Sequence, residues 1–403
     1  MSEKIKWKEN TLKQGNKENS VKFLCEEEIR KAKNFHSSFP QYNETPLVSL
    51  ESLANHIGLG GVYIKDESYR FGLNAFKVLG GSFAMAKYLA GKLGKDISEL
   101  PYEKIISDEV RKELGDITFV TATDGNHGRG VAWTANQLKQ KSVVYMPKGS
   151  SLTRLKNIRA EGSEASITDL NYDDAVRLAN KYAEEHNGLM VQDTAWEGYE
   201  EIPAWIMQGY GTMALEAKEQ LEKYNVEKPT HIFVQAGVGS LAGAVQGYFA
   251  ATYKDECPKT VIVEANLADC LYKSAVANDG EARSVGGDMQ TIMAGLACGE
   301  ANTIGWEVLK NHSKIFVSCP DWVSAKGMRV LGNGMKDDVK VVSGESGAVT
   351  AGLLYEIMTN LDYEDLKKSL ELDENSKVLL FSTEGDTDPD KYRSIVWNGE
   401  YGI

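Results

Sequence analysis

Lys77 is the one charged residue in an apolar, small-residue segment, FGLNAFKVLGGSFAMA, which runs from Phe71 to Ala86. Asn74 predicts the start of a helix within this segment. Lysine is almost never fully buried unless it is paired. An amine removed from water loses its proton more readily, and the neutral amine is a nucleophile that forms a Schiff base with an aldehyde. The segment therefore predicts a reactive lysine with a ligand as its partner.

The first loop whose residues could take part in binding or catalysis is TATDGNHGRGVAW, residues 121–133. A strand is expected to end at Thr123, Asp124 and Gly125 to make a turn, and Asn126 or His127 to begin a helix. Free backbone N–H groups at a helix start suit a carboxylate or a phosphate. A plain strand-to-helix turn with an asparagine cap explains this loop equally well, and a lone histidine is more often structural than catalytic.

A second loop, QAGVGSLAGAVQGY at residues 235–248, again follows a predicted strand and precedes a predicted helix. Its glycines at 237, 239 and 243 are spaced one residue too widely for the dinucleotide fingerprint G-x-G-x-x-G. This spacing disfavours a hydride-transfer cofactor. Backbone amides around Gly239 can instead surround one phosphate group, although a single loop of this kind is weak evidence.

A third loop, FSTEGDTD at residues 381–388, follows the apolar run KVLL. Ser382 and Thr383 can offer a neutral hydroxyl to a heteroaromatic nitrogen, or the loop can be an ordinary polar turn. The three loops and Lys77 together describe one ligand, a planar ring that carries a phosphate, an aldehyde and a ring nitrogen. That ligand is pyridoxal 5′-phosphate.

The elements that must position these loops alternate along the chain. Short β-branched runs predict strands: 61–66, 116–123, 141–147, 164–168, 189–194, 231–237, 260–265, 314–319 and 377–385. Amphipathic helices lie between them, which predicts an α/β fold with parallel sheets covered by helices. Ligands bind at the carboxyl ends of such strands, where these loops lie. The first 40 residues and the segments 92–116 and 266–312 break the alternation and are interpreted as decoration.

The three motifs resemble those of the fold type II pyridoxal-phosphate enzymes, the group of tryptophan synthase β, threonine dehydratase and cysteine synthase. NAFK at 74–77 is similar to their lysine motif, DGNHG at 124–128 to their asparagine loop and GVGSLAG at 237–243 to their phosphate loop. The resemblance covers roughly residues 40–390. It implies two domains with mainly parallel sheets and an active site between them: a large domain of 1–95 and 210–403, and a small domain of 96–209.

The resemblance also assigns residues. Lys77 is similar to the Schiff-base lysine, Asn126 to the asparagine beside the 3-oxygen of the ring, and Thr383, with Ser382 adjacent, to the partner of the ring nitrogen. The residues that resemble the family's phosphate site are Gly237, Val238, Gly239, Ser240 and Leu241.

A closer resemblance is to the members of this family that act on 2,3-diaminopropionate, carried by the strings VQDTAWEGY, GGDMQTIMAGLACGE, SGESGAV and STEGDTD. It implies α,β-elimination of both enantiomers to pyruvate and ammonia by a homodimer. Asp124 stands where dehydratases usually carry serine, and it is expected to be a second base opposite Lys77. Asp193 is expected to hold the leaving amine, with Thr123 and His127 beside the substrate.

Charge and composition narrow the partners to small molecules. Forty-five basic and 58 acidic residues give a net charge of −13, which repels nucleic acid and anionic lipid. No apolar run approaches the length of a membrane span or of a signal-peptide core, so we expect a cytoplasmic protein. The five scattered cysteines are expected to be reduced, without a metal site. The alternatives are a serine or threonine dehydratase and, more remotely, a non-catalytic module that binds nucleotides or phosphate ligands.

Overall fold

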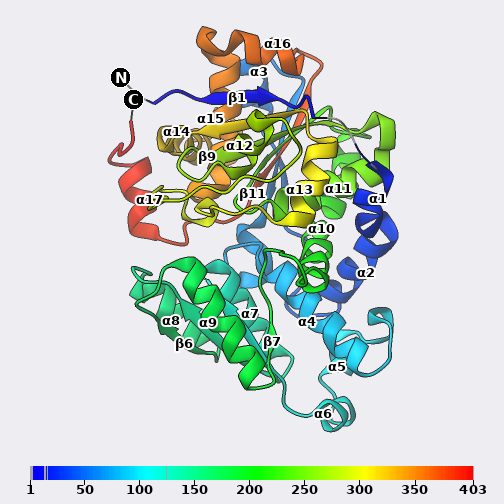
Figure 1. Ribbon diagram of the computed structural model, residues 1–403. Coiled ribbons are helices and arrows are strands. Elements are labelled where there is room, and N and C mark those ends of the chain that lie inside the picture. Colours follow the sequence, from blue (N-terminus) through cyan, green and yellow to red (C-terminus); the bar gives the residue numbers. More distant parts are fainter. Residues whose placement is uncertain (1–2, 13–14, 16, 124, 403) are drawn as a thin grey trace. The chain divides into compact units, whose positions relative to one another are not determined.

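A computed structural model describes residues 3–12, 15, 17–123 and 125–402 and divides the chain into two compact units (Figure 1). Unit 1 spans Met1–Glu26, Glu44–Ala75 and Met213–Ile403, and unit 2 spans Glu27–Asn43 and Phe76–Thr212. The sequence assigned 76–95 to the large domain, whereas this segment, with Lys77, belongs to unit 2. The reason is packing, because the helix that follows Lys77 contacts the helix that follows the DGNHG loop.

Unit 1 is built on a seven-stranded sheet. Its strands, in spatial order, are β1 (Lys6–Glu9), β10 (Ile315–Cys319), β9 (Lys259–Ala265), β8 (His231–Gln235), β11 (Lys377–Ser382), β3 (Gly61–Asp66) and β2 (Leu47–Ser49). The five inner strands are parallel, and β1 and β2 pair antiparallel at the two edges. All five side chains of β8 are buried, as expected for a strand covered on both faces.

Helices surround this sheet (Figure 1). The helices of unit 1 are α1 (Lys17–Val21), α3 (Glu51–Ile57), α11 (Ser240–Tyr253), α12 (Cys270–Ala277), α13 (Thr303–His312), α14 (Asp321–Gly332), α15 (Glu345–Thr359), α16 (Glu364–Leu370) and α17 (Pro389–Val396). Among them, α14 and α15 pack closely against each other, and α11 packs against α13. The sheet therefore has its ligand-side loops at one edge, because its inner strands all run the same way.

Unit 2 contains a four-stranded parallel sheet in the order β6 (Glu164–Ile167), β5 (Lys141–Met146), β4 (Thr118–Ala122) and β7 (Leu189–Met190). Its helices are α2 (Glu26–Ser37), α4 (Val78–Lys92), α5 (Tyr102–Ile105), α6 (Asp108–Leu114), α7 (Asn126–Gln137), α8 (Leu152–Ala160), α9 (Tyr172–Glu185) and α10 (Glu201–Leu221), of which α10 continues into unit 1. In the described part of the chain, no helix is long and apolar enough to cross a membrane.

The nine predicted strands are all present, with ends that differ by a few residues. The interpretation of the first 40 residues as decoration is wrong, because β1 forms an edge of the large sheet and α2 belongs mostly to unit 2. The predicted helix start at Asn74 is also wrong. Asn74 has a left-handed backbone with φ of 59°, and α4 begins four residues later, with Lys77 as its N-cap.

Candidate active site

Lys77 is placed by the first turn of α4. This helix lies against α7, where Gly81 on α4 faces Val131 and Gly130 on α7 faces the backbone of Val78. With no side chain at Gly130, the two helix backbones approach closely. The side chain of Lys77 is 22% exposed, and its Nζ lies 5.5 Å from the centre of the Phe76 ring. The amine is thus held at the end of a helix by close packing.

The partner of Lys77 is Asp193, which follows β7. The Lys77 ammonium donates a hydrogen bond to the Asp193 carboxylate, whose side chain is 7% exposed. Burial alone would raise the pKa of Asp193, but the charge and the hydrogen bond of the Lys77 ammonium outweigh it, so the pKa lies well below its usual range. Asp193 therefore remains an anion, and it lies beside Lys77, another of the predicted catalytic residues.

His127, in the first turn of α7, is the third member of this group. Its Nε2–H donates to the carbonyl oxygen of Val191 at 2.8 Å, which leaves Nδ1 as the unprotonated nitrogen. Burial lowers the pKa of the imidazole, so the ring is neutral. Nδ1 lies 3.9 Å from Asp193 Oδ2 and has no hydrogen-bond partner among the described residues. Two acceptors that face each other in this way can share a cation such as an ammonium group.

The other predicted residues of this loop have different roles. Asn126 is the first residue of α7, as predicted. Thr123 is 5% exposed, and its hydroxyl accepts a hydrogen bond from Gly125 N at 3.1 Å, so it shapes the turn. Asp124 lies outside the described residues.

The glycine loop of unit 1 has the geometry of an anion site. β8 ends at Gln235, Gly239 takes a left-handed φ of 97°, and α11 begins at Ser240 without a side-chain cap. The amides of the first turn of a helix have no partners within the helix, and the positive end of its dipole attracts anions. A Cβ at Gly237 would lie 3.3 Å from the backbone of Gly295, so a side chain at this position would be crowded. These features fit the phosphate of the predicted cofactor.

The third loop meets the second through Gln235. Because β8 and β11 are neighbours in the sheet, their carboxyl ends lie side by side. Gln235 Nε2 donates to Thr383 Oγ1 at 2.9 Å, and Thr383 Oγ1 donates to Glu384 Oε2 at 2.7 Å. Ser382 Oγ donates instead to Ser343 at 2.8 Å. Gln235 Oε1 is buried without a hydrogen-bond partner in the described chain, as expected where a polar ligand group completes the site.

Chain geometry links this loop to Lys77. Ala75 forms an antiparallel bridge with Glu384, and Gly385 N donates to Asn74 O at 3.1 Å. Lys77 follows Ala75 by two residues, so its Cα lies within about 7.6 Å of the bridged residue. The segment that carries the amine is therefore attached to the loop that carries Thr383.

Sequence reasoning missed Tyr210, Gln235 and Glu384. Tyr210 is fully buried in α10, its ring centre lies 4.8 Å from that of Phe76, and burial with the nearby Asp193 carboxylate raises the pKa of its phenol far above the usual range. The string GYGT, a hydroxyl between two glycines in an apolar helix, was the available signal.

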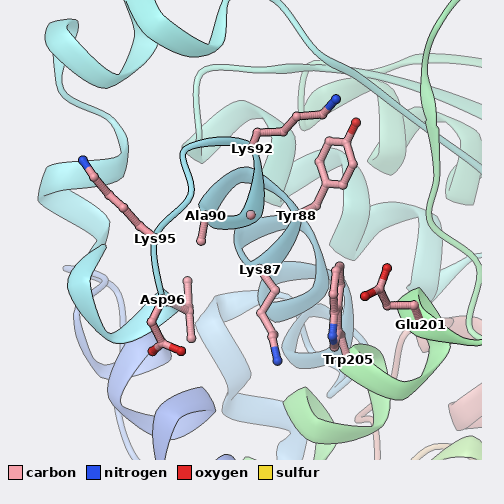
Figure 2. A pocket seen from close by; sticks show the side chains of 10 residues that line it. Lys87, Tyr88, Ala90, Lys92, Lys95, Asp96, Glu201 and Trp205 are labelled. Atoms are coloured by element: carbon pink, nitrogen blue, oxygen red, sulfur yellow. The ribbon is translucent and has the colours of Figure 1, made fainter.

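A surface pocket of about 450 Å³ lies at the far end of α4 and contains none of the predicted site residues. Figure 2 shows Lys87 between Asp96 and Trp205, with Lys92 beside Tyr88. A helix of 15 residues is about 22 Å long, so this pocket is separate from the group around Lys77.

Comparison with known proteins places the chain in a family. Residues 39–383 match the family described as pyridoxal-phosphate dependent enzyme. A diaminopropionate ammonia-lyase from Salmonella typhimurium is 56% identical over 366 residues, which cover 91% of this chain and 91% of that protein.

Comparison with solved structures leads to the same family. The Escherichia coli diaminopropionate ammonia-lyase in complex with an aminoacrylate-PLP azomethine reaction intermediate is 45% identical, with a TM-score of 0.89 over 99% of this chain and 98% of that chain. Threonine deaminase isoform 2 from Solanum lycopersicum, at 18% identity and a TM-score of 0.71, covers 98% of this chain and 97% of that chain and shares the fold. The predicted fold class and cofactor are thereby confirmed. The chain belongs to the pyridoxal-phosphate dependent enzymes and, within them, to the diaminopropionate ammonia-lyases.

Proposed function

We propose that this protein eliminates ammonia from D- and L-2,3-diaminopropionate and yields pyruvate and two molecules of ammonia. The single observation that carries the proposal beyond family membership is the position of Lys77 beside the buried side chains of Asp193 and His127. It combines a reactive amine with a permanent anion and a neutral imidazole. These groups suit a diamine that must lose one amino group as ammonia.

Lys77, Asn126, Thr383 and the loop 237–241 would hold pyridoxal phosphate. The cofactor supplies an electron sink for the Cα carbanion and lowers the barrier to its formation. The amides at the start of α11 are proposed to bind the phosphate, and Thr383 is proposed to meet the ring nitrogen as a neutral hydroxyl. A neutral partner limits positive charge on the ring, which favours elimination over transamination.

Lys77 is proposed as the base that removes the Cα proton on one face of the substrate. A positioned base contributes about 10²–10⁴-fold to the rate. Asp124 is proposed as the base on the opposite face, which would allow one site to act on both enantiomers. Asp124→Asn should then reduce turnover of the D enantiomer far more than that of the L enantiomer, and equal losses would assign Asp124 to substrate binding instead.

Asp193 and His127 are proposed to receive the β-amino group. When Lys77 acts as a neutral base it no longer neutralises Asp193, which retains its negative charge beside the lone pair of His127 Nδ1, and an ammonium group between the two acceptors would satisfy both. An amine leaves more easily when it is protonated, because it then departs as neutral ammonia. Thr123, which fixes the neighbouring turn, is proposed to border the substrate.

The test is product analysis with purified protein and cofactor. Each enantiomer of 2,3-diaminopropionate, and separately serine and threonine, is supplied, and pyruvate, 2-oxobutyrate and ammonia are measured. We expect two ammonia per pyruvate from both diaminopropionate enantiomers and far slower turnover of the hydroxy amino acids. Faster release from serine or threonine would instead favour a dehydratase, and a protein that binds the cofactor without turnover would favour a binding module.

We also propose that the protein works as a cytoplasmic homodimer. The five cysteines form no disulfide bond in the described part of the chain, as expected in a reducing compartment. Light scattering of the purified protein tests the assembly, since a dimer has twice the 44.4 kDa of one chain, and a monomer at working concentration would contradict it.

A further inference from the structure

Unit 1 contains a cluster of polar and charged side chains removed from solvent, here termed the ionic cluster. Its members are Thr45, Lys65, Glu67, Arg70, Glu216 and Gln220, each less than 9% exposed. None of them is among the predicted site residues. The four charged members are 0% exposed, and two are positive and two negative.

Arg70 is the centre of the ionic cluster. Its guanidinium donates to both carboxylate oxygens of Glu67, at 2.8 and 2.9 Å, and to both of Glu216, at 2.9 and 2.7 Å. Two bidentate pairs fix the position and the plane of the guanidinium, because the directions of its N–H groups are rigid.

Lys65 completes the network with three acceptors. Its Nζ lies 2.6 Å from Glu216 Oε2 and donates to Thr45 O at 2.6 Å and to Gln220 Oε1 at 2.8 Å. The Thr45 hydroxyl in turn donates to Glu67 Oε1 at 2.6 Å. All three protons of the ammonium group are thus used.

Stability alone does not explain this arrangement. The free energy needed to remove the charged groups from water cancels much of the attraction between them. Apolar side chains of similar volume therefore often stabilise a protein as well or better. Rigid geometry is what the ion pairs provide and apolar contacts do not. The position of the ionic cluster in the chain indicates what is held rigid.

The ionic cluster joins the points where the chain passes between the two units. Unit 1 resumes at Glu44, ends again at Ala75 and resumes at Met213. Thr45, Arg70 and Glu216 are each within a few residues of one of these points. Three separate crossings are therefore connected through one set of side chains.

The crossing after Arg70 leads to Lys77 through an unusual turn. Phe71, Gly72 and Asn74 have left-handed φ angles of 50°, 71° and 59°. Side chains disfavour this conformation at Phe71 in particular, so tertiary contacts must maintain it. Arg70 anchors the start of the turn, and the contacts of Asn74 and Ala75 with residues 384–385 anchor its end.

We propose that Arg70, held by Glu67 and Glu216, is a positioning residue: it maintains the left-handed turn of residues 71–74 that presents the Lys77 amine to the cofactor. The proposal rests on the proposed role of Lys77. Arg70 itself is buried in the ionic cluster and acts only through the backbone.

The test compares Arg70→Lys with the wild type. The substitution retains the charge but cannot form two bidentate pairs. Hydrogen exchange of the amides of residues 70–77 is measured in the cofactor-free protein, and the rate at which the absorbance band of the lysine-bound cofactor appears is measured after pyridoxal phosphate is added. We expect faster exchange in this segment and a capture rate lower by about 10- to 100-fold, the range for a displaced reactive group.

Lys326→Met is the matched control, because it breaks another ion pair of unit 1, between α14 and α15, with Glu356 3% exposed. It should lower the melting temperature while exchange at 70–77 and the capture rate remain those of the wild type. Wild-type exchange and capture in folded Arg70→Lys would overturn the proposal. If Arg70→Lys does not fold, the double variant Arg70→Met/Glu216→Leu replaces it, since it removes one charge of each sign. The same two measurements, hydrogen exchange at residues 70–77 and the capture rate, then decide the proposal. Amide hydrogen exchange in the cofactor-free protein does not depend on catalysis. Failure of the proposed function would appear separately, as a wild-type protein that forms no pyruvate.

Discussion

Gly130→Ala tests whether the packing of α7 against α4 places Lys77. A Cβ at Gly130 would lie 2.9 Å from Val78 Cα, 3.0 Å from Val78 N and 3.3 Å from the carbonyl carbon of Lys77. These are backbone atoms, which cannot rotate away as a side chain can. The helices must therefore separate by several tenths of an ångström to reach ordinary contact, which begins at 3.4 Å.

The size of the effect follows from two opposing terms. Alanine is favoured over glycine in a helix interior by about 1 kcal/mol, whereas overpacking costs about 1–3 kcal/mol. The net loss of unfolding free energy should be about 0–2 kcal/mol. Since a displacement of 1 Å can cost about 10²-fold in rate, a shift of about half that distance should lower kcat by about tenfold.

Gly81→Ala is the matched control on the facing helix, because its nearest neighbour would be Val131 Cγ2 at 3.4 Å. The assays are pyruvate formation, for kcat, and urea unfolding, for stability. Gly81→Ala should retain the wild-type kcat and gain about 0.4–1 kcal/mol. A Gly130→Ala variant with wild-type kcat and the same gain in stability would refute the reasoning.

Three further predictions concern the site. Asp193→Asn should lower kcat/KM for 2,3-diaminopropionate by at least about 30-fold, because the β-ammonium loses a buried charge partner. The loss for L-serine should be smaller, because L-serine has no β-ammonium group. Equal losses for both substrates would contradict the proposed role of Asp193 in binding the ammonium group. The pKa of His127 is lowered in the folded protein, so the unfolded chain binds this proton more readily. The neutral imidazole therefore contributes stability that is complete above about pH 6.5 and is lost as the pH falls toward the folded pKa. The free energy of unfolding then decreases by at most about 1.4 kcal/mol per pH unit. His127→Asn should flatten the decline in unfolding free energy between about pH 7 and 5, and an unchanged slope in urea titrations would refute this. Thr383→Val should cost about 1–3 kcal/mol, because Gln235 and Glu384 lose a buried partner, and should shift the absorbance maximum of the bound cofactor; an unshifted maximum would exclude Thr383 as the partner of the ring nitrogen.

Local patterns predicted much of the fold and part of the site. Lys77 stood out because a lysine in an apolar segment requires a partner; the predicted partner was a cofactor aldehyde, and nothing in the local sequence indicated that Asp193 also pairs with Lys77. The glycine loop at 237–241 was found because a turn after a buried strand and before a helix has a recognisable composition, with Gly239 left-handed as such turns require.

Features set by distant contacts escaped prediction. β1 has the sequence KWKE, without the apolar alternation of a strand, and is fixed by pairing with β10. Asn74 has the composition of a helix cap, but its contact with Gly385 holds it in a left-handed turn. Arg70 and Glu216 are fully buried, and nothing in their local sequence predicts it. In each case the deciding partner is more than 100 residues away in the sequence.

The central claim is that Lys77 is the residue to which pyridoxal phosphate binds. The most direct measurement is reduction of the purified protein and cofactor with borohydride, followed by proteolysis and mass spectrometry of the pyridoxyl-labelled peptide. We expect one labelled peptide, with the label on Lys77, and none in Lys77→Ala. A label on another lysine in the wild type, or no label on any peptide, would contradict it.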